Sequence, residues 1–232
     1  MRDQPERLGG LPEEDEVDGT FASGVSLPVR GADVMDRVSI TVGDLVALDE
    51  VDGIVNAANA ALDGGGGNVD AAVHAAAGGG LAAHTAAHHP GGCAVGLAIV
   101  TPAFDLERRG VRRIVHTVAP VWEAGAEGEQ AKLGYTREDV LLASCYMNSL
   151  KLAAAEGLKR LAFAPLSTEL GGFPKERAAK IALGHVLGYL LGRPTPELPA
   201  HVAFCCRSEP DALVLRHAAA TRTQWMLNRT RA

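Results

Sequence analysis

Residues 55–70 read VNAANAALDGGGGNVD, so that four consecutive glycines lie between two asparagines and an aspartate. The glycines at 64–67 can adopt positive φ without steric cost, and their N–H groups can therefore converge on an anion. A helix predicted to begin near Asp70 would direct its positive end at the same point. This stretch therefore predicts a phosphate-binding loop.

An apolar run precedes the glycine-rich loop. Gly53–Val55 predicts a buried strand, and Asn56 and Asn59 follow at its carboxyl end, where open α/β sheets bind ligands. The chain contains no GxxxxGK(S/T) sequence, and paired asparagines stand where a GxGxxG fingerprint would begin. The loop is therefore neither a Walker-type loop nor a typical dinucleotide fingerprint.

The charge of the 232-residue chain is uneven. Residues 1–36 carry nine acidic and three basic side chains, which leaves 28 − 9 = 19 acids and 22 − 3 = 19 bases in the remainder. Residues 37–232 are thus formally neutral, which argues against nucleic acid as a partner. The acidic leader is poor in bulky apolar side chains, which predicts a largely disordered segment with room for a short strand at Val25–Val29.

Targeting and redox features are sparse. No basic segment followed by an apolar one marks a secretory signal, and no run of about 18 apolar residues predicts a transmembrane helix. The four cysteines show no CxxC spacing, and a chain of this size does not need disulfides. We therefore expect a cytoplasmic monomer without a membrane partner.

Extended apolar runs alternate with helical patterns after the leader. Strands are expected at Val38–Val42, Gly53–Val55, Leu97–Val100, Arg113–Val118, Arg160–Ala164 and His201–Phe204. Helices are expected at Asp70–Ala77, Glu138–Glu156, Lys175–Leu191 and Pro210–Ala219. This alternation predicts a sheet with helices on both faces, in one domain over residues 37–222 followed by a tail at 223–232.

A second loop follows the strand at Arg160–Ala164 and reads PLSTELGGFPKE at residues 165–176. Its Ser, Thr and glycine pair open into the next helix, with Pro174 at the first turn. Alone, this is ordinary loop and cap chemistry. Beside the first loop it makes a second candidate anion site, and two such sites at one sheet edge suit a diphosphate.

Eight motifs occur in order along residues 38–219. They are VGDL at 42–45, VDGIVNAAN at 51–59, the GGGG loop with Val69-Asp70, AAVHAAAG at 71–78, GGCAVG at 91–96, RIVHTVAP at 113–120, SCYMNSLKLA at 144–153 and STELGGFP at 167–174. In this order they resemble the macrodomain family, specifically its MacroD-type ADP-ribose hydrolases. The resemblance implies a three-layer α/β/α sandwich with a mixed central sheet and an ADP-ribose ligand in a cleft across the strand ends.

The resemblance also implies roles for single residues. Asp44 would accept a hydrogen bond from the adenine amino group, with the Leu45 backbone beside it. Asn59 would contact the distal ribose and Asp70 would activate or position water near the anomeric carbon, which makes them the expected catalytic pair. Asp70 could also serve as a helix N-cap. The expected remaining ligand contacts are Ala57, Gly65, Gly66, Gly67, Asn68 and Val69 in the first loop, and Ser167, Thr168, Glu169, Leu170, Gly171, Gly172 and Phe173 in the second.

The chain departs from the family pattern in both loops. Asn68 is inserted after the last glycine, so Asn59 and Asp70 are one residue further apart. Either the glycines absorb this insertion, or Asp70 moves away from the ribose. Glu169 stands where the family commonly has glycine and would weaken diphosphate binding if it faced the ligand, unless it took over acid–base work. We expect it to point to solvent.

One histidine-rich segment suggests a metal. His84, His88, His89 and Cys93 offer zinc-type ligands, but their spacing matches no standard ligand pattern. We expect exposed helix-end and loop residues there, and no zinc or other cofactor.

Two functions are consistent with the site. The leading hypothesis is an enzyme that removes ADP-ribose from acidic side chains of ADP-ribosylated proteins, with O-acetyl-ADP-ribose deacetylation as a related ester cleavage. The alternative is a module that binds ADP-ribose without turnover. Asn59 with Asp70 favours the enzyme, whereas Asn68 and Glu169 favour the binding module. A third class, processing of nucleic-acid ends, has little support, because residues 37–232 are formally neutral.

Overall fold

The computed structural model describes residues 34–123, 134–191 and 199–229, with side chains described up to residue 222. Within these ranges the strands form one mixed sheet, as predicted for the α/β class. The strands are β1 (Val38–Val42), β2 (Gly53–Ala57), β3 (Ala98–Pro102), β4 (Arg113–Thr117), β5 (Arg160–Phe163) and β6 (His201–Cys206).

The strand order is β1-β6-β5-β2-β4-β3. β3 runs antiparallel to β4, and the other neighbouring pairs are parallel. The carboxyl ends of β1, β6, β5, β2 and β4 therefore meet at one edge of the sheet. This edge is where open α/β sheets place their ligand sites.

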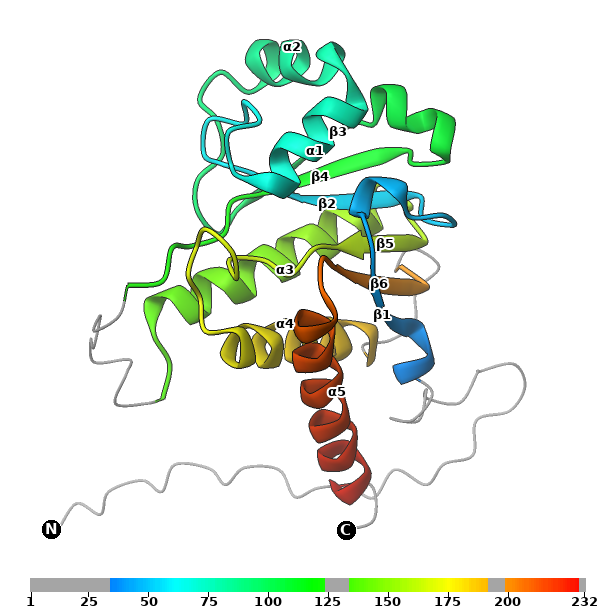
Figure 1. Ribbon diagram of the computed structural model, residues 1–232, viewed down its shortest axis with the longest axis vertical. Helices are drawn as coiled ribbons and strands as arrows, with labels where there is room; N and C mark the ends of the chain where they lie inside the picture. Colours follow the sequence, from blue (N-terminus) through cyan, green and yellow to red (C-terminus); the bar gives the residue numbers. More distant parts are fainter. Residues whose placement is uncertain (1–33, 124–133, 192–198, 230–232) are drawn as a thin grey trace, which may run out of the picture.

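Helices cover both faces of the sheet and make the expected three layers. The α-helices are α1 (Asn68–Ala77), α2 (Gly79–His88), α3 (Arg137–Ala155), α4 (Lys175–Leu191) and α5 (Glu209–Arg229), and the 3-10 helices are η1 (Met35–Arg37), η2 (Leu45–Ala47) and η3 (Phe104–Arg109). Figure 1 shows α2 near the β3 end of the sheet and α5 near the β1 end.

The core follows from the alternation of side chains along each strand. On β2, Ile54 packs with α1, α2 and η3 on one face, whereas Val55 packs with α3, α4 and α5 on the other. On β6, Phe204 lies on the second face and Cys205 on the first. The strands are thus apolar on both faces, as expected for parallel strands between two helical layers.

The predicted elements agree with the structure except at their ends and at one helix. Helix α2 was not predicted, because it begins with two glycines and buries only Leu81 and Thr85. Val34 is fully buried, three residues before the predicted domain start, and α5 continues ten residues beyond the predicted Ala219. The predicted strand at Val25–Val29 lies outside the described residues.

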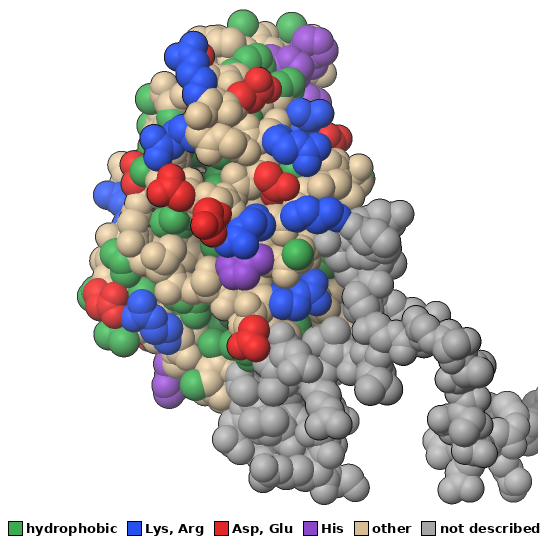
Figure 2. Space-filling view, turned by 90° about the vertical axis from the view of Figure 1, so that its right-hand side faces the viewer, with side chains coloured by type: hydrophobic (Ala, Val, Ile, Leu, Met, Phe, Trp, Pro, Cys, Tyr) green, Lys and Arg blue, Asp and Glu red, His purple; other side chains and the backbone are tan. Residues whose placement is uncertain are grey.

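The four cysteines belong to the hydrophobic core. All four cysteines are unbridged and buried. The face shown in Figure 2 carries Lys and Arg interspersed with Asp and Glu, so this face has no single basic patch. None of the helices in the described ranges combines the length and the apolar character that crossing a bilayer requires.

Candidate functional site

Two adjoining cavities lie along the carboxyl ends of the parallel strands. The first, which we call the Asp44 cavity, has a volume of about 350 Å³ and lies at the ends of β1, β6 and β5. The second, the Asn59 cavity, has a volume of about 310 Å³ and lies at the ends of β5, β2 and β4. Both are lined by Asn68, Val69, Pro165 and Glu169, which we call the junction.

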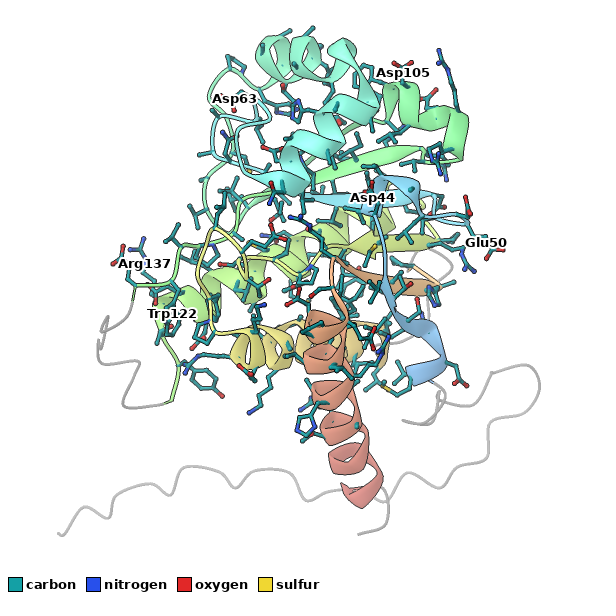
Figure 3. The ribbon with its side chains drawn as sticks, viewed as in Figure 1. Asp44, Glu50, Asp63, Asp105, Trp122 and Arg137 are labelled. Carbon is teal, nitrogen blue, oxygen red and sulfur yellow. The ribbon has the colours of Figure 1, made fainter. Side chains whose placement is uncertain are left out.

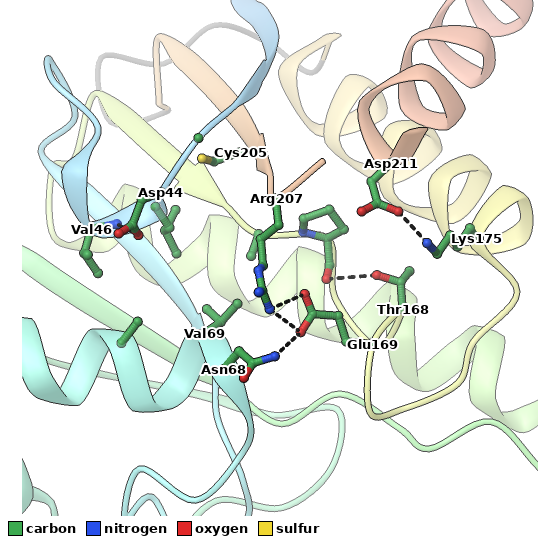
Figure 4. A pocket seen from close by; sticks show the side chains of 15 residues that line it. Asp44, Val46, Asn68, Val69, Thr168, Glu169, Lys175, Cys205, Arg207 and Asp211 are labelled. Atoms are coloured by element: carbon green, nitrogen blue, oxygen red, sulfur yellow. Dashed lines mark hydrogen bonds and ion pairs between the residues drawn. The ribbon is translucent and has the colours of Figure 1, made fainter. Parts of the chain in front are cut away.

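The Asp44 cavity presents charged groups to its ligand (Figure 4). Asp44 follows β1, and one of its oxygens accepts a hydrogen bond from Val46 N at 3.1 Å, which caps η2. Its second oxygen has no hydrogen-bond partner among the described residues and is available to an amino donor. Across the cavity, Lys175 Nζ donates to Asp211 Oδ1 at 2.6 Å, and Arg207 follows β6.

The Asn59 cavity is bordered by the glycine-rich loop. Asn59 Nδ2 donates to Asp63 Oδ1 at 2.7 Å, and Gly65 N donates to the same oxygen at 2.9 Å. These two hydrogen bonds lower the pKa of the Asp63 carboxyl, and the bond from Asn59 has the larger effect. Figure 3 shows Asp63 in this loop, above Asp44 in the view. The carboxylate therefore fixes the turn that leads into the glycines.

Gly66 is required by close packing rather than by its φ angle. A Cβ atom there would lie 2.6 Å from the backbone N of Asn59 and 2.7 Å from Asp70 Oδ2. Gly67 has φ of 112°, in the region that favours glycine. Helix α1 then begins at Asn68 itself.

Asp70 lies beneath the loop and not in a cavity. Its side chain is 0% exposed, its Oδ1 accepts a hydrogen bond from Asn56 Nδ2 at 2.6 Å, and its Oδ2 accepts one from Gly66 N at 2.7 Å. His74 Nε2 lies 3.6 Å from Oδ1. Asp70 therefore ties the glycine loop to β2, and in this conformation it does not reach the ligand space where it was expected. It is the third residue of α1, and the N-cap is Gly67.

A buried chain of polar groups continues behind Asp70. Asn56 Nδ2 also lies 3.1 Å from His116 Nδ1, and His116 Nε2 lies 3.0 Å from Thr101 Oγ1. If the Asn56 amide were turned over, its oxygen would face the Asp70 carboxylate, which has no hydrogen to donate. The Nδ2 group therefore faces Asp70 and His116 and donates a hydrogen bond to each. His116 Nδ1 is then an acceptor, and its Nε2–H donates to Thr101. The chain links β2, β4 and β3 to the glycine loop.

The second loop is fixed by backbone bonds. Phe173 N donates to Ser167 O at 2.9 Å, Trp122 N donates to Gly171 O at 2.7 Å, and Ser167 Oγ donates to Pro120 O. Phe173 is only 2% exposed and packs against Trp122 with ring centroids 4.7 Å apart. The Phe173 ring therefore belongs to the core in this conformation, and its contact with a ribose stays a prediction.

Glu169 closes the junction between the two cavities. Its Oε2 lies 3.4 Å from Asn68 Nδ2, and both carboxylate oxygens lie 3.4 Å from Arg207 Nη1. The Glu169 side chain is 43% exposed, in line with the expectation that it faces solvent, and it also reaches across the cleft to Arg207 and Asn68 (Figure 4). Asn68 and Glu169, where the sequence was expected to depart from the family pattern, therefore contact each other.

Most of the predicted ligand residues line one of the cavities. They are Asp44, Leu45 and Thr168 in the Asp44 cavity, Ala57, Asn59, Gly66, Gly67, Ser167, Leu170 and Gly171 in the Asn59 cavity, and Asn68, Val69 and Glu169 in both. Four predicted residues line neither, namely Gly65, Asp70, Gly172 and Phe173.

Sequence reasoning missed the contribution of the last strand. Arg207 and Cys205 line the Asp44 cavity from β6, and Lys175 and Asp211 line it from α4 and α5. The signal for Arg207 in the sequence is its place just after the strand predicted at His201–Phe204, because ligands bind at the carboxyl ends of parallel strands.

The histidine-rich segment does not assemble a metal site in the described parts of the chain. No group of three or more His, Cys, Asp or Glu side chains there is arranged to hold a metal ion. The His84 and His88 rings stack with centroids 4.1 Å apart, and Cys93 is buried.

Comparison with known proteins gives a consistent result. A family model described as Macro domain matches residues 55–182. A Macro domain-containing protein of Mesorhizobium japonicum is 44% identical over 189 residues, which cover 81% of this chain and 97% of the relative. An O-acetyl-ADP-ribose deacetylase of an Enterobacter species is 43% identical over 177 residues, which cover 76% of this chain and 89% of the relative.

Solved structures show the same likeness. The Trypanosoma brucei macrodomain in complex with ADP-ribose superposes with a TM-score of 0.68 at 29% identity, covering 83% of this chain and 73% of that one. The Oceanobacillus iheyensis macrodomain with MES bound gives a TM-score of 0.66 at 31% identity, covering 80% of this chain and 91% of that one.

Replacing Gly66 by Ala should destabilise the protein. The added methyl group would meet the backbone at Asn59, which cannot move without displacing the end of β2, so we expect a loss of about 1–3 kcal/mol in the free energy of unfolding. Urea unfolding would measure it. Gly91→Ala is the matched control, because nothing lies within 4 Å of a Cβ there. Equal stability of the two variants would contradict this account of the loop.

The buried His116 should make stability depend on pH. Burial, with a smaller effect of neighbouring histidines, lowers its pKa from 6.5 to about 3. The unfolded chain therefore binds a proton that the folded protein does not, so stability is fully present above about pH 6.5 and falls towards pH 3, by up to about 1.4 kcal/mol per pH unit.

Urea unfolding between about pH 7 and pH 5 would test this dependence. His116→Gln should flatten the curve, whereas replacement of the exposed His217 should leave it as in the wild type. Parallel curves for the wild type and His116→Gln would show that His116 is not held neutral in the fold.

Proposed function

The chain belongs to the Macro domain family, and on that premise we propose that it is a hydrolase that binds ADP-ribose and removes mono-ADP-ribose from modified acidic side chains of proteins. The observation that carries the proposal is the pair of adjoining cavities across the ends of five strands, with Asp44 in one and Asn59 in the other. A ligand with a nucleoside at one end of a diphosphate and a sugar at the other fits this division. ADP-ribose has that form.

The adenine half suits the Asp44 cavity. A carboxylate accepts hydrogen bonds only, so the uncapped oxygen of Asp44 suits the adenine amino group. Leu45 and Val46 line the same cavity, beside Asp44. Leu45 and Val46 offer an apolar surface to the adenine ring, and Asp44 offers a hydrogen-bond acceptor to its amino group.

The diphosphate suits the junction and the loops beside it. Gly66, Gly67 and the first residues of α1 border one side, and Ser167 and Gly171 border the other. Glycine-rich backbone and a helix N-terminus both favour an anion. The distal ribose then lies beside Asn59, whose carboxamide can orient its hydroxyl groups.

Ester cleavage at this ribose needs a positioned water and little covalent help. Asn59 is the group in the cavity that positions the ribose. Asp70 positions the loop through Gly66, and it can reach water only if the bond between Gly66 N and Asp70 Oδ2 opens. The same cleavage chemistry would serve O-acetyl-ADP-ribose, the substrate for which the Enterobacter relative is named.

One observation favours the alternative, a module that binds ADP-ribose without turnover. Asp70 is 0% exposed and both of its oxygens accept hydrogen bonds, so it is not free to act as a base in this conformation. If the loop stays closed when ligand binds, binding would occur without hydrolysis.

A comparison of variants separates the two functions. Wild type, Asn59→Ala, Asp70→Asn and the control Asp105→Asn would be incubated with a protein carrying ADP-ribose on glutamate. Release of ADP-ribose would be followed beside calorimetric binding. Asp105 is exposed and lines neither cavity. Asp70→Asn retains the side-chain volume, and circular dichroism would confirm its fold.

We expect release by the wild type and the control, and release about 100-fold slower from Asp70→Asn. Asn59→Ala should slow release and weaken binding together, because it removes a contact to the ribose. Tight binding by the wild type without release would reject the hydrolase for this linkage and leave the binding module.

A further inference from the structure

An ion pair lies at the junction of the two cavities. Glu169 lies on the second loop, Asn68 begins α1, and Arg207 follows β6 (Figure 4). Both Glu169 oxygens lie 3.4 Å from Arg207 Nη1, and Oε2 lies 3.4 Å from Asn68 Nδ2. Three segments that are distant in the sequence thus meet through one carboxylate.

These contacts are weak enough to be exchanged. The Glu169 and Arg207 side chains are 43% and 56% exposed, and each contact is long for a charged pair. Exposed ion pairs of this kind contribute little to stability, because solvent screens them. A ligand group with more negative charge and better geometry can therefore replace Glu169 at Arg207.

The position of Glu169 decides which ligand groups can replace it at Arg207. Glu169 lines both cavities, so a ligand that spans them passes its carboxylate. A diphosphate at that point would meet a negative charge unless Glu169 moved away. Arg207 is already directed at the same point, and its guanidinium suits a phosphate as well as a carboxylate.

We propose that Glu169 and Arg207 form an exchange pair that selects for the diphosphate: Glu169 occupies Arg207 when the cleft is empty, and the diphosphate displaces it when ligand binds. This inference rests on the proposed binding of ADP-ribose across both cavities. Glu169 then lowers affinity for the diphosphate, Arg207 raises it, and Asn68 restrains Glu169 in the blocking position. Glu169 is a specificity-determining residue, and Arg207 is a ligand contact.

The test compares calorimetric affinities for ADP-ribose at about 0.05 M and about 1 M salt, since surface charge effects are strongly screened at the higher concentration. The proteins are wild type, Glu169→Gln, Arg207→Gln and Glu107→Gln. Glu107 is exposed on η3 and lines neither cavity, so its variant makes the same change of charge elsewhere.

At low salt, Glu169→Gln should bind ADP-ribose about three- to fivefold more tightly, and Arg207→Gln should bind it more weakly by a similar factor. Both changes should shrink at high salt. Glu107→Gln should bind like the wild type under both conditions.

Several results would overturn the exchange pair. Equal or weaker binding by Glu169→Gln would show that Glu169 does not oppose the ligand, and a gain that persists undiminished at high salt would show that residue 169 acts by hydrogen bonding and not by charge. If neither the wild type nor Glu169→Gln binds ADP-ribose, the proposed function fails as well. Binding by the wild type with no change in either variant rejects the exchange pair alone.

Discussion

The hydrogen bond from Asn56 Nδ2 to Asp70 Oδ1, 2.6 Å long and fully buried, is the interaction on which the site depends. It joins the end of β2 to the first turn of α1 across the whole glycine-rich loop. The other Asp70 oxygen accepts the Gly66 N–H, so one carboxylate fixes both ends of the loop. Because a buried carboxylate without partners is costly, these bonds hold Asp70 in place and the loop with it.

The two cavities follow from this arrangement and from the order of the strands. Because β1, β6, β5, β2 and β4 are parallel, five loops leave the sheet at one edge. The fixed glycine loop forms one wall of the Asn59 cavity, and the start of α1 separates it from the Asp44 cavity. Glu169 then lies where the two meet. Side chains that are far apart in sequence thus act on one elongated ligand.

Much of this could be predicted from local sequence patterns. The apolar runs gave the strands, the alternation with helices gave the layers, and the glycines with their flanking asparagines gave the binding edge. Helix α2 was missed because it begins Gly79-Gly80 and has few apolar residues. The burial of Asp70 and Phe173 could not be predicted, because it depends on partners such as Asn56 and Trp122, whose side chains meet them only in the folded chain. Likewise, the contact between Glu169 and Arg207 requires the position of β6 beside β5.

The claim that a single ligand spans both cavities can be tested by following backbone amide chemical shifts during titration with ADP-ribose. We expect the amides of Val46 in the Asp44 cavity and of Gly67 in the Asn59 cavity to shift with the same dissociation constant. The amides of Lys151 and Lys180, which lie in the groove between α3 and α4, should not move. Shifts confined to one cavity, or two different constants for the two cavities, would contradict a single spanning ligand.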